Sequence, residues 1–256
     1  MLVVALAAAT LGVQAERVAV SISRDGPRPA AGRLEHRAHG RMSKRFAAAG
    51  LQVRVQRFST PRGRSRNVIG VYRANPPRRC LRVVMAHTDT VPPSPGAEDN
   101  ASGLGVLAEL AMRLDAIDPP CAVWLVATGA EERIYTGSPD HLGSLALTRI
   151  VPRSRLRYAL SIDEVGVGNR LRLRSPVAKP RRRVEREMLS ARVDWQRDSD
   201  TGNSDHREFE LAGLRGVKIG TLDNPCRHTA CDTASRLERR TFTLALKTVE
   251  RALRRR

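Results

Sequence analysis

Residues 81–90 read Leu81-Arg-Val-Val-Met-Ala-His87-Thr-Asp89-Thr90. The first six residues form a short apolar run typical of a strand buried on both faces, and this run ends at His87. A histidine at the carboxyl end of a buried strand lies where α/β proteins collect their functional groups. The segment therefore predicts a strand in a central sheet and a candidate ligand at the sheet's edge.

Two later apolar runs end in the same way. Residues 122–127 precede a glycine and the pair Glu131-Glu132, and residues 158–162 run directly into Asp163. Between these strands, apolar residues recur at helical spacing from Ser102 onward. This alternation predicts an α/β fold, a three-layer sandwich with a mostly parallel central sheet and helices on both faces.

Other elements are expected on either side of these strands. They are a helix over residues 28–49, a strand pair near residues 53–55 and 67–72, an edge strand at 170–174, an exposed basic loop at 176–183, a late strand at 216–220 and a final amphipathic helix at 241–253. No repeat or linker divides the chain. We therefore expect one domain spanning residues 16–256.

The N-terminus carries an export signal by its composition. Residues 2–13 are almost continuously apolar, and Val13-Gln14-Ala15 places small residues where a signal peptidase cuts. We expect a signal peptide over residues 1–15 and a secreted or periplasmic mature chain; a buried helix and a lipid anchor are the alternatives. The run is shorter than the roughly 20 apolar residues that span a bilayer, so no transmembrane span is expected.

The four cysteines are an even number in a chain expected to be exported, which allows two disulfides. Cys226 and Cys231 flank His228, and a bridge between them would stiffen that loop. Cys80 and Cys121 each precede a strand, and parallel neighbouring strands could bring them together. A zinc–thiolate site is the alternative, although neither pair has the short C-x-x-C spacing that such sites favour.

A formal net charge of +19 raises the question of nucleic-acid binding. Arginine supplies nearly all of the positive charge and is scattered along the chain, while aromatic residues make up only 4%. No basic stripe with interleaved aromatic residues is present. We therefore expect no specific nucleic-acid partner, and the alternative of a basic nucleic-acid-binding protein is remote.

Several of these turns carry side chains that zinc accepts. Imidazole nitrogen and carboxylate oxygen are its ligands, and a catalytic site leaves one position for water. The candidate metal ligands are His87, Asp99, Glu132, Asp163 and His228. Asp89 follows His87 by two residues, so we expect its carboxylate to receive the second N–H of that ring.

Glu131 stands beside a candidate ligand. Outside a regular helix, adjacent side chains point in different directions, so Glu132 can bind metal while Glu131 acts as a general base. On its own such a pair is more often an exposed acidic loop. His36, His39 and His141 are expected to serve packing or surface roles. His206 could be a ligand, a substrate contact or a structural hydrogen bonder.

In combination and order, these motifs resemble the secreted bacterial dizinc aminopeptidases, metalloexopeptidases with a phosphorylase/hydrolase-like fold. The resemblance covers nearly all of the mature chain. The segments that carry it are 28–29, 67–70, 86–90, 94–103, 131–132 with 137–138, 163–166, 204–206 with Phe209, and 228–233.

The resemblance implies two Zn²⁺ ions, one bound by His87 and Asp163 and the other by Glu132 and His228, with Asp99 bridging them. It also implies that the peptide bond after Asp99 is cis. Glu131 would be the general base for a shared water that becomes the nucleophile. The expected substrate is a peptide with a free N-terminus, its amino group held by Glu131 and Asp163, and the expected enzyme is a monomer. Hydrophobic N-terminal residues are expected by family analogy only.

The chain departs from the family pattern in two places. Relatives often carry Tyr immediately before the last His to stabilise the oxyanion, whereas this chain has Arg227, a candidate for the oxyanion or for a substrate contact. Ile134-Tyr135 replaces the commoner Gly-Leu after the glutamate pair. Asp232 and the threonines on either side of it, Thr229 and Thr233, are expected to hold the last loop by local hydrogen bonds.

Two related groups share the ligand types. Carboxypeptidases and deacylases insert a further domain between the later ligands, and the segment from Asp163 to His228 is too short for one. Glutaminyl cyclases typically use one zinc and favour Trp beside the last His, and Arg227 together with residues 100–103 argues against that group. An inactive binding module would be expected to lose ligands, and none is missing.

Overall fold

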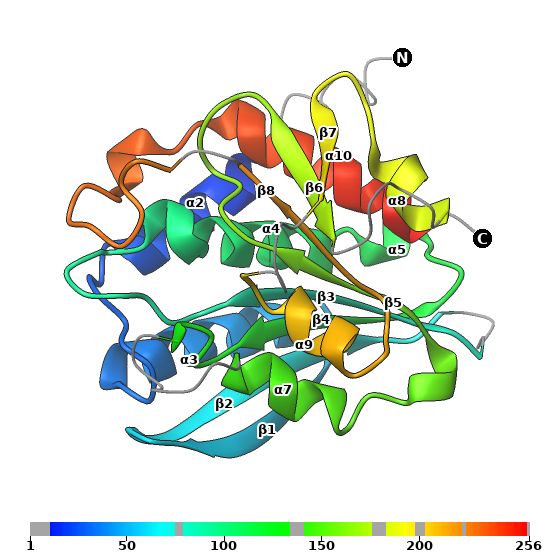
Figure 1. The fold of residues 1–256 in the computed structure, drawn as a ribbon, viewed down its shortest axis with the longest axis horizontal. Coiled ribbons are helices and arrows are strands. Elements are labelled where there is room, and N and C mark those ends of the chain that lie inside the picture. The colour runs from blue at the N-terminus through cyan, green and yellow to red at the C-terminus, as the bar shows by residue number, and fades with distance from the viewer. Residues whose placement is uncertain are drawn as a thin grey trace.

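A central eight-stranded sheet organises the described part of the chain, residues 11–74, 79–133, 141–175, 183–197, 203–221 and 224–254 of this computed structural model. Its strand order is β1-β2-β4-β3-β5-β8-β6-β7 (Figure 1). The strands are β1 (Gln52–Thr60), β2 (Gly63–Tyr72), β3 (Leu81–His87), β4 (Ala122–Thr128), β5 (Leu156–Ile162), β6 (Leu171–Ser175), β7 (Val193–Arg197) and β8 (Gly216–Gly220).

The helices among the described residues connect these strands. They are α2 (Val13–Ser23), α3 (Arg33–Ala48), α4 (Ser102–Ala111), α5 (Leu114–Ile117), α7 (Leu142–Thr148), α8 (Arg183–Met188), α9 (His206–Leu211) and α10 (Arg239–Arg254). A short π-helical turn covers Ala97–Ala101, and 3₁₀ turns cover Arg153–Arg155 and Ala234–Arg236. None of the described helices is both long and apolar enough to cross a membrane.

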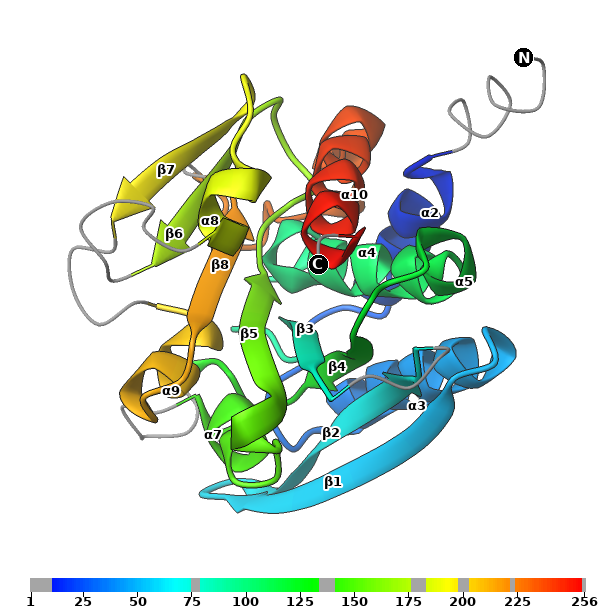
Figure 2. The same cartoon turned by 90° about the vertical axis from the view of Figure 1, so that its right-hand side faces the viewer.

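The centre of the sheet is parallel, as the sequence predicts. Strands β4, β3, β5 and β8 run parallel to one another, whereas β2 is antiparallel to β4 and β6 is antiparallel to β8. Figure 2 shows α2, α4 and α10 on one side of β3 and β5, and α7 on the other. The core divides in the same way, into a large cluster on the side of α2, α4 and α10 and a smaller one with Leu147 and Phe209. The predicted three-layer α/β fold is confirmed.

The first expected helix begins later than predicted. α3 starts at Arg33 rather than at residue 28. Pro29 disfavours helical geometry in Arg28, and Ala31 has a φ of 62°, which a right-handed helix does not allow. The buried guanidinium of Arg28 instead donates to the carbonyls of Thr88, Pro95 and Gly96 at 2.7–3.0 Å. Arg28 therefore braces the loop after β3.

Two other expectations need correction at the far edge of the sheet. The predicted edge strand, β6, is internal, because β7 pairs with it in parallel and forms the edge. The alternation of Leu and Arg reflects one buried and one half-buried face rather than an edge position. The expected basic loop lies almost entirely outside the described residues.

Helix α2 occupies the segment in which export processing is expected. Ala15 is fully buried, and its backbone N–H donates to Glu109 at 2.9 Å, as does that of Gly12 at 3.0 Å. The expected cleavage point after Ala15 thus falls inside a helix packed against α4. Residues 1–10 lie outside the described residues.

The first disulfide joins two neighbouring strands at their starts. Leu81 of β3 pairs with Ala122 of β4, which sets Cys80 opposite Cys121 with their Cα atoms 4.9 Å apart. This geometry suits a disulfide, and the bridge is formed. The pairing predicted from parallel neighbouring strands is confirmed.

Candidate metal centre

The carboxyl ends of three adjacent strands bring the predicted ligands together. His87 ends β3, Asp163 directly follows β5, and Glu131-Glu132 lies just beyond β4. Because β4, β3 and β5 are parallel neighbours, these ends meet at one edge of the sheet. All four side chains are almost fully buried.

Asp99 lies between two groups of ligand atoms. Its Oδ1 is 3.0 Å from His87 Nε2, which is itself 3.3 Å from Asp163 Oδ1. Its Oδ2 is 3.3 Å from His228 Nε2, which is itself 3.1 Å from Glu132 Oε2. Each oxygen of one carboxylate therefore faces a different pair of side chains.

Local hydrogen bonds fix the turn that carries Asp99. The peptide bond between Asp99 and Asn100 is cis, as the resemblance implied. The Asn100 amide donates to the Ile162 carbonyl at 2.8 Å and accepts from the Gly103 N–H at 2.9 Å. A Cβ at Gly103 would lie 2.5 Å from that carbonyl, so only glycine fits between this turn and β5.

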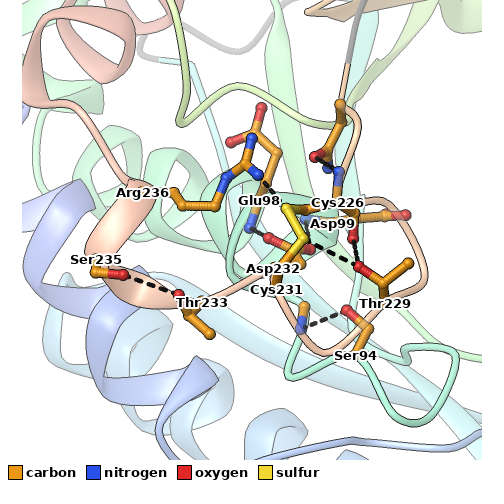
Figure 3. Close-up of a disulfide and its surroundings, with 12 residues drawn as sticks. Ser94, Glu98, Asp99, Cys226, Thr229, Cys231, Asp232, Thr233, Ser235 and Arg236 are labelled. Atoms are coloured by element: carbon orange, nitrogen blue, oxygen red, sulfur yellow. Dashed lines mark hydrogen bonds between the residues drawn. A yellow bond between two sulfur atoms is a disulfide. The ribbon is translucent and has the colours of Figure 1, made fainter.

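The second disulfide holds the loop that presents His228. Cys226 and Cys231 are bridged, as predicted, with Cα atoms 5.2 Å apart (Figure 3). Within the loop, the Thr229 hydroxyl donates to the Cys226 carbonyl at 2.8 Å. The Asp232 backbone N–H also donates locally, to the Thr229 carbonyl at 3.2 Å, but its side chain reaches outside the loop. Its two carboxylate oxygens accept the backbone N–H groups of Glu98 and Asp99 at 2.8 and 3.0 Å, which ties this loop to the turn that carries Asp99 (Figure 3).

Asp89 contacts the His87 ring through its backbone carbonyl, whereas a contact through its carboxylate was expected. The ring nitrogen His87 Nδ1 lies 3.1 Å from the backbone carbonyl of Asp89 and 3.8 Å from its carboxylate. The carboxylate instead accepts the N–H groups of Glu131 and Glu132, each at 3.0 Å. Strand geometry explains the difference, because the backbone after β3 turns its carbonyl to the ring and its side chain toward the end of β4.

The expected general base is buried. Burial raises the pKa of Glu131 well above its usual range, and the neighbouring carboxylates of Glu132 and Asp163 add to this. His141 Nε2 lies 3.5 Å from Glu131 Oε1, and its Nδ1 lies 2.9 Å from Glu208. Burial lowers the pKa of His141 to about 4, so a neutral ring links the two glutamates. The sequence analysis assigned His141 to packing or the surface.

Lys218 is a second residue that the sequence analysis did not place at the centre. It lies on β8 beside β5, is almost fully buried, and donates from Nζ to Asp163 Oδ2 at 2.8 Å. Burial opposes ionisation of Asp163, but this ammonium and the His87 ring outweigh it and hold the pKa of the carboxyl well below its usual range. The expected role of Asp163 in holding a substrate amino group stays a prediction.

Arg227 lies at the mouth of the centre. Its Nε is 3.4 Å from Asp99 Oδ2, and its side chain is about one-third exposed, at 36%. A small pocket opens here. The described residues that line it are Glu131, Glu132, Arg133, His141, Asn203, Arg227 and His228. All of these are polar, while Ile134 and Tyr135 lie outside the described residues.

The side chains around Asp99 fit zinc not only by residue type but also because several of their buried polar atoms have unsatisfied hydrogen-bonding capacity. Asp99 Oδ2, Glu132 Oε1 and His228 Nε2 are buried atoms that lack a hydrogen-bond partner of good geometry among the described residues. Unsatisfied buried atoms of this kind are costly unless a ligand completes them. The sets His87–Asp99–Asp163 and Asp99–Glu132–His228 each gather their ligand atoms within 4.8 Å. His206, the ambiguous histidine of the sequence analysis, belongs to neither set.

Comparison with known proteins agrees with this geometry. The family model described as Peptidase family M28 matches residues 67–253. The chain belongs to peptidase family M28. This M28 chain is 31% identical over 160 residues to aminopeptidase YwaD of Bacillus subtilis (strain 168), a match that covers 59% of the chain and 34% of the relative. It thus spans about a third of the length of that relative.

Solved structures show the same fold at low sequence identity. BSAP, a zinc aminopeptidase from Bacillus subtilis, superposes with a TM-score of 0.84 at 16% identity, covering 94% of each chain. A glutaminyl cyclase from Tannerella forsythia superposes with a TM-score of 0.81 at 20% identity, covering 96% of this chain and 98% of the other. Fold similarity alone therefore does not separate hydrolysis from cyclisation in this M28 chain.

Proposed function

We propose that this protein is a dizinc aminopeptidase that removes the N-terminal residue from peptides. The observation that carries the proposal is the position of Asp99, whose two oxygens face two separate ligand pairs. A single ion would need only one of these pairs. His87 and Asp163 would hold one zinc ion, Glu132 and His228 the other, and Asp99 both.

When bound, the ions would polarise the scissile carbonyl and lower the pKa of a water. Glu131 would accept the proton of the attacking water and deliver it to the departing amine. His141 would hold Glu131 in place. Arg227 would donate to the oxyanion, a role open to a guanidinium beside the centre.

We further propose that the chain acts outside the cytoplasm. Both disulfides are formed, and such bonds persist in oxidising compartments such as the periplasm and the extracellular space. This supports secretion or export to the periplasm. A peptide with a free N-terminus is the proposed substrate, and a monomer the proposed assembly.

The test compares three substrates with the purified full chain: Leu-p-nitroanilide, its N-acetylated form, and a peptide beginning with glutamine. An aminopeptidase releases nitroaniline from the first only, loses this activity on chelation and regains it with zinc. Glu131→Gln is expected to lower kcat by about 10²–10⁴-fold without loss of bound zinc. Asp194→Asn, the same kind of change on the surface, is the control.

Two results would contradict the proposal. Cyclisation of the glutamine peptide without hydrolysis of the anilide would favour the glutaminyl cyclase alternative. Hydrolysis that survives both chelation and Glu131→Gln would exclude the mechanism.

A further inference from the structure

One turn of α3 carries a group of potential ligands that the proposed function does not use. Glu35, His36 and His39 offer a carboxylate oxygen and two ring nitrogens within 4.8 Å of one another. Residues three and four apart share one face of a helix, which brings His39 next to both of the others. Glu35 and His39 are fully buried, and the side chain of His36 is 31% exposed.

Hydrogen bonds fix the tautomer of His39. Thr88 Oγ1 donates its single proton to the Thr128 carbonyl, which can only accept. Thr88 must therefore accept from His39 Nε2, 2.7 Å away, so Nε2 carries the ring proton. Burial lowers the pKa of His39 to about 3, so the ring is neutral and its Nδ1 presents a bare lone pair. This buried Nδ1 has no hydrogen-bond partner in the described part of the chain.

Glu35 has capacity for one more partner. Its Oε1 accepts from the Ser65 hydroxyl at 2.8 Å and the Ala130 N–H at 3.0 Å, while among the described residues its Oε2 accepts only from the Ala31 N–H at 2.9 Å. Once deprotonated, the carboxylate can accept about four hydrogen bonds, so Oε2 keeps a free lone pair. Because burial raises the pKa of Glu35 to about 8, a cation would bind there with release of the proton. Glu35 Oε2 lies 3.9 Å from His36 Nδ1.

His36 opens the group to solvent. Its Nδ1 is buried and also lacks a hydrogen-bond partner within the described ranges, while the side chain as a whole is 31% exposed. Burial, followed by the charge of Arg66, lowers the pKa of both imidazoles, which keeps them in the neutral form that binds metal. The same charge would weaken the affinity for a cation.

We propose that Glu35 Oε2, His36 Nδ1 and His39 Nδ1 form an accessory binding site for a zinc-type divalent cation, with water in the fourth position. Two imidazoles and one carboxylate suit Zn²⁺ rather than Ca²⁺ or Mg²⁺, which prefer oxygen ligands. The site is separate from the ligands around Asp99. Its neighbour on that side is the Ala130 N–H, next to Glu131, which donates to Glu35 Oε1.

The test is a zinc titration of the chelator-treated full chain against a chromophoric chelator, with visible absorption of Co²⁺ as a second readout. His36→Ala is expected to bind one equivalent fewer than the wild type, or to bind that equivalent at least about 10–100-fold more weakly. Arg37→Ala, a change of the next residue on the same helix, is the matched control and should keep the wild-type count.

The difference of one equivalent does not depend on how many ions the Asp99 centre holds. Anilide hydrolysis by His36→Ala should match the wild type once the Asp99 centre is loaded, because His36 does not contact that centre. If circular dichroism shows that His36→Ala folds poorly, the zinc titration is repeated with His36→Asn, which is expected to bind one equivalent fewer than the wild type as well. Wild-type stoichiometry and affinity in the variant, or a loss of more than one equivalent, would overturn the proposal.

Discussion

Arg227 brings a positive charge to a position where the resemblance would place a neutral phenol. If its guanidinium donates to the oxyanion, the interaction is stronger in the transition state than with the bound substrate. Arg227→Ala should then lower kcat by about 10²–10³-fold with little change in KM. Arg227→Tyr should keep more of the activity. Steady-state kinetics on Leu-p-nitroanilide would measure both, and a rise in KM at unchanged kcat would mean that Arg227 only binds substrate.

Lys218 neutralises the buried carboxylate of Asp163, a proposed zinc ligand, while no ion is bound. Lys218→Met should therefore leave Asp163 as an uncompensated buried charge and lower the free energy of unfolding by about 3–5 kcal/mol. Urea denaturation with a chelator present measures this loss. The double variant Lys218→Met/Asp163→Asn should recover much of the lost stability, because it no longer buries an uncompensated charge. Added zinc should also reduce the loss in Lys218→Met, because a cation again faces Asp163. An unchanged midpoint in the single variant would contradict this.

Residues at the candidate centre differ in how far the sequence could predict them. His87 ends a recognisable strand, Asp163 follows another, and Asp99 lies in a recognisable turn. The local sequence pattern was therefore sufficient to select these three residues as candidates. Lys218 and His141 reach the centre through pairing and packing between distant segments, which leaves no local signal. A lysine in a short apolar strand was the one available clue to a buried ion pair.

At the scale of elements, the two disulfides close loops of very different length. Cys80–Cys121 spans 41 residues, while Cys226–Cys231 spans 5. In the chain-entropy treatment, losing the first should cost about 4 kcal/mol of unfolding free energy and losing the second about 2 kcal/mol. Activity should follow the opposite order, because the shorter loop presents His228.

Paired Cys→Ser variants, measured by urea denaturation and anilide hydrolysis, would check both orders. Near-wild-type activity in the Cys226→Ser/Cys231→Ser variant would show that Asp232 alone holds the loop. That result would have a structural basis, because the Asp232 carboxylate accepts hydrogen bonds from the backbone N–H groups of Glu98 and Asp99.

Helices and strands with a distinctive pattern of apolar residues were predictable from the sequence. Elements whose position depends on pairing with other segments were not. The buried strands β3, β4, β5 and β8 were predicted to within two residues, because continuous apolar runs bounded by turns are distinctive. Short helices such as α7 and α9 carry too few turns to show a period. The position of β6 inside the sheet depends on β7, a strand of only five residues that the sequence analysis did not predict.

At the scale of the whole molecule, stability depends on protons held inside the fold. Burial, followed by the nearby charge of Asp89, raises the pKa of Glu35 from 4.5 to about 8. The folded chain therefore keeps a proton that the unfolded chain releases as pH rises through 4.5. The free energy of unfolding should fall over that interval by a few kcal/mol, on the order of 1.4 kcal/mol for each pKa unit of difference, and level off above about pH 8.

Glu35→Gln isolates this contribution, because an amide cannot titrate. Measured by urea denaturation with a chelator between about pH 5 and about pH 8, the stability of the variant relative to the wild type should rise with pH. Asp194→Asn should show no such slope, because the surface pairs with Arg170 and Arg172 lower the pKa of Asp194 and leave it ionised in both states over this range. Parallel pH curves for Glu35→Gln and the wild type would mean that Glu35 is already ionised in the fold. Its bonds to Ser65, Ala130 and Ala31 would then compensate a buried charge rather than hold a protonated acid.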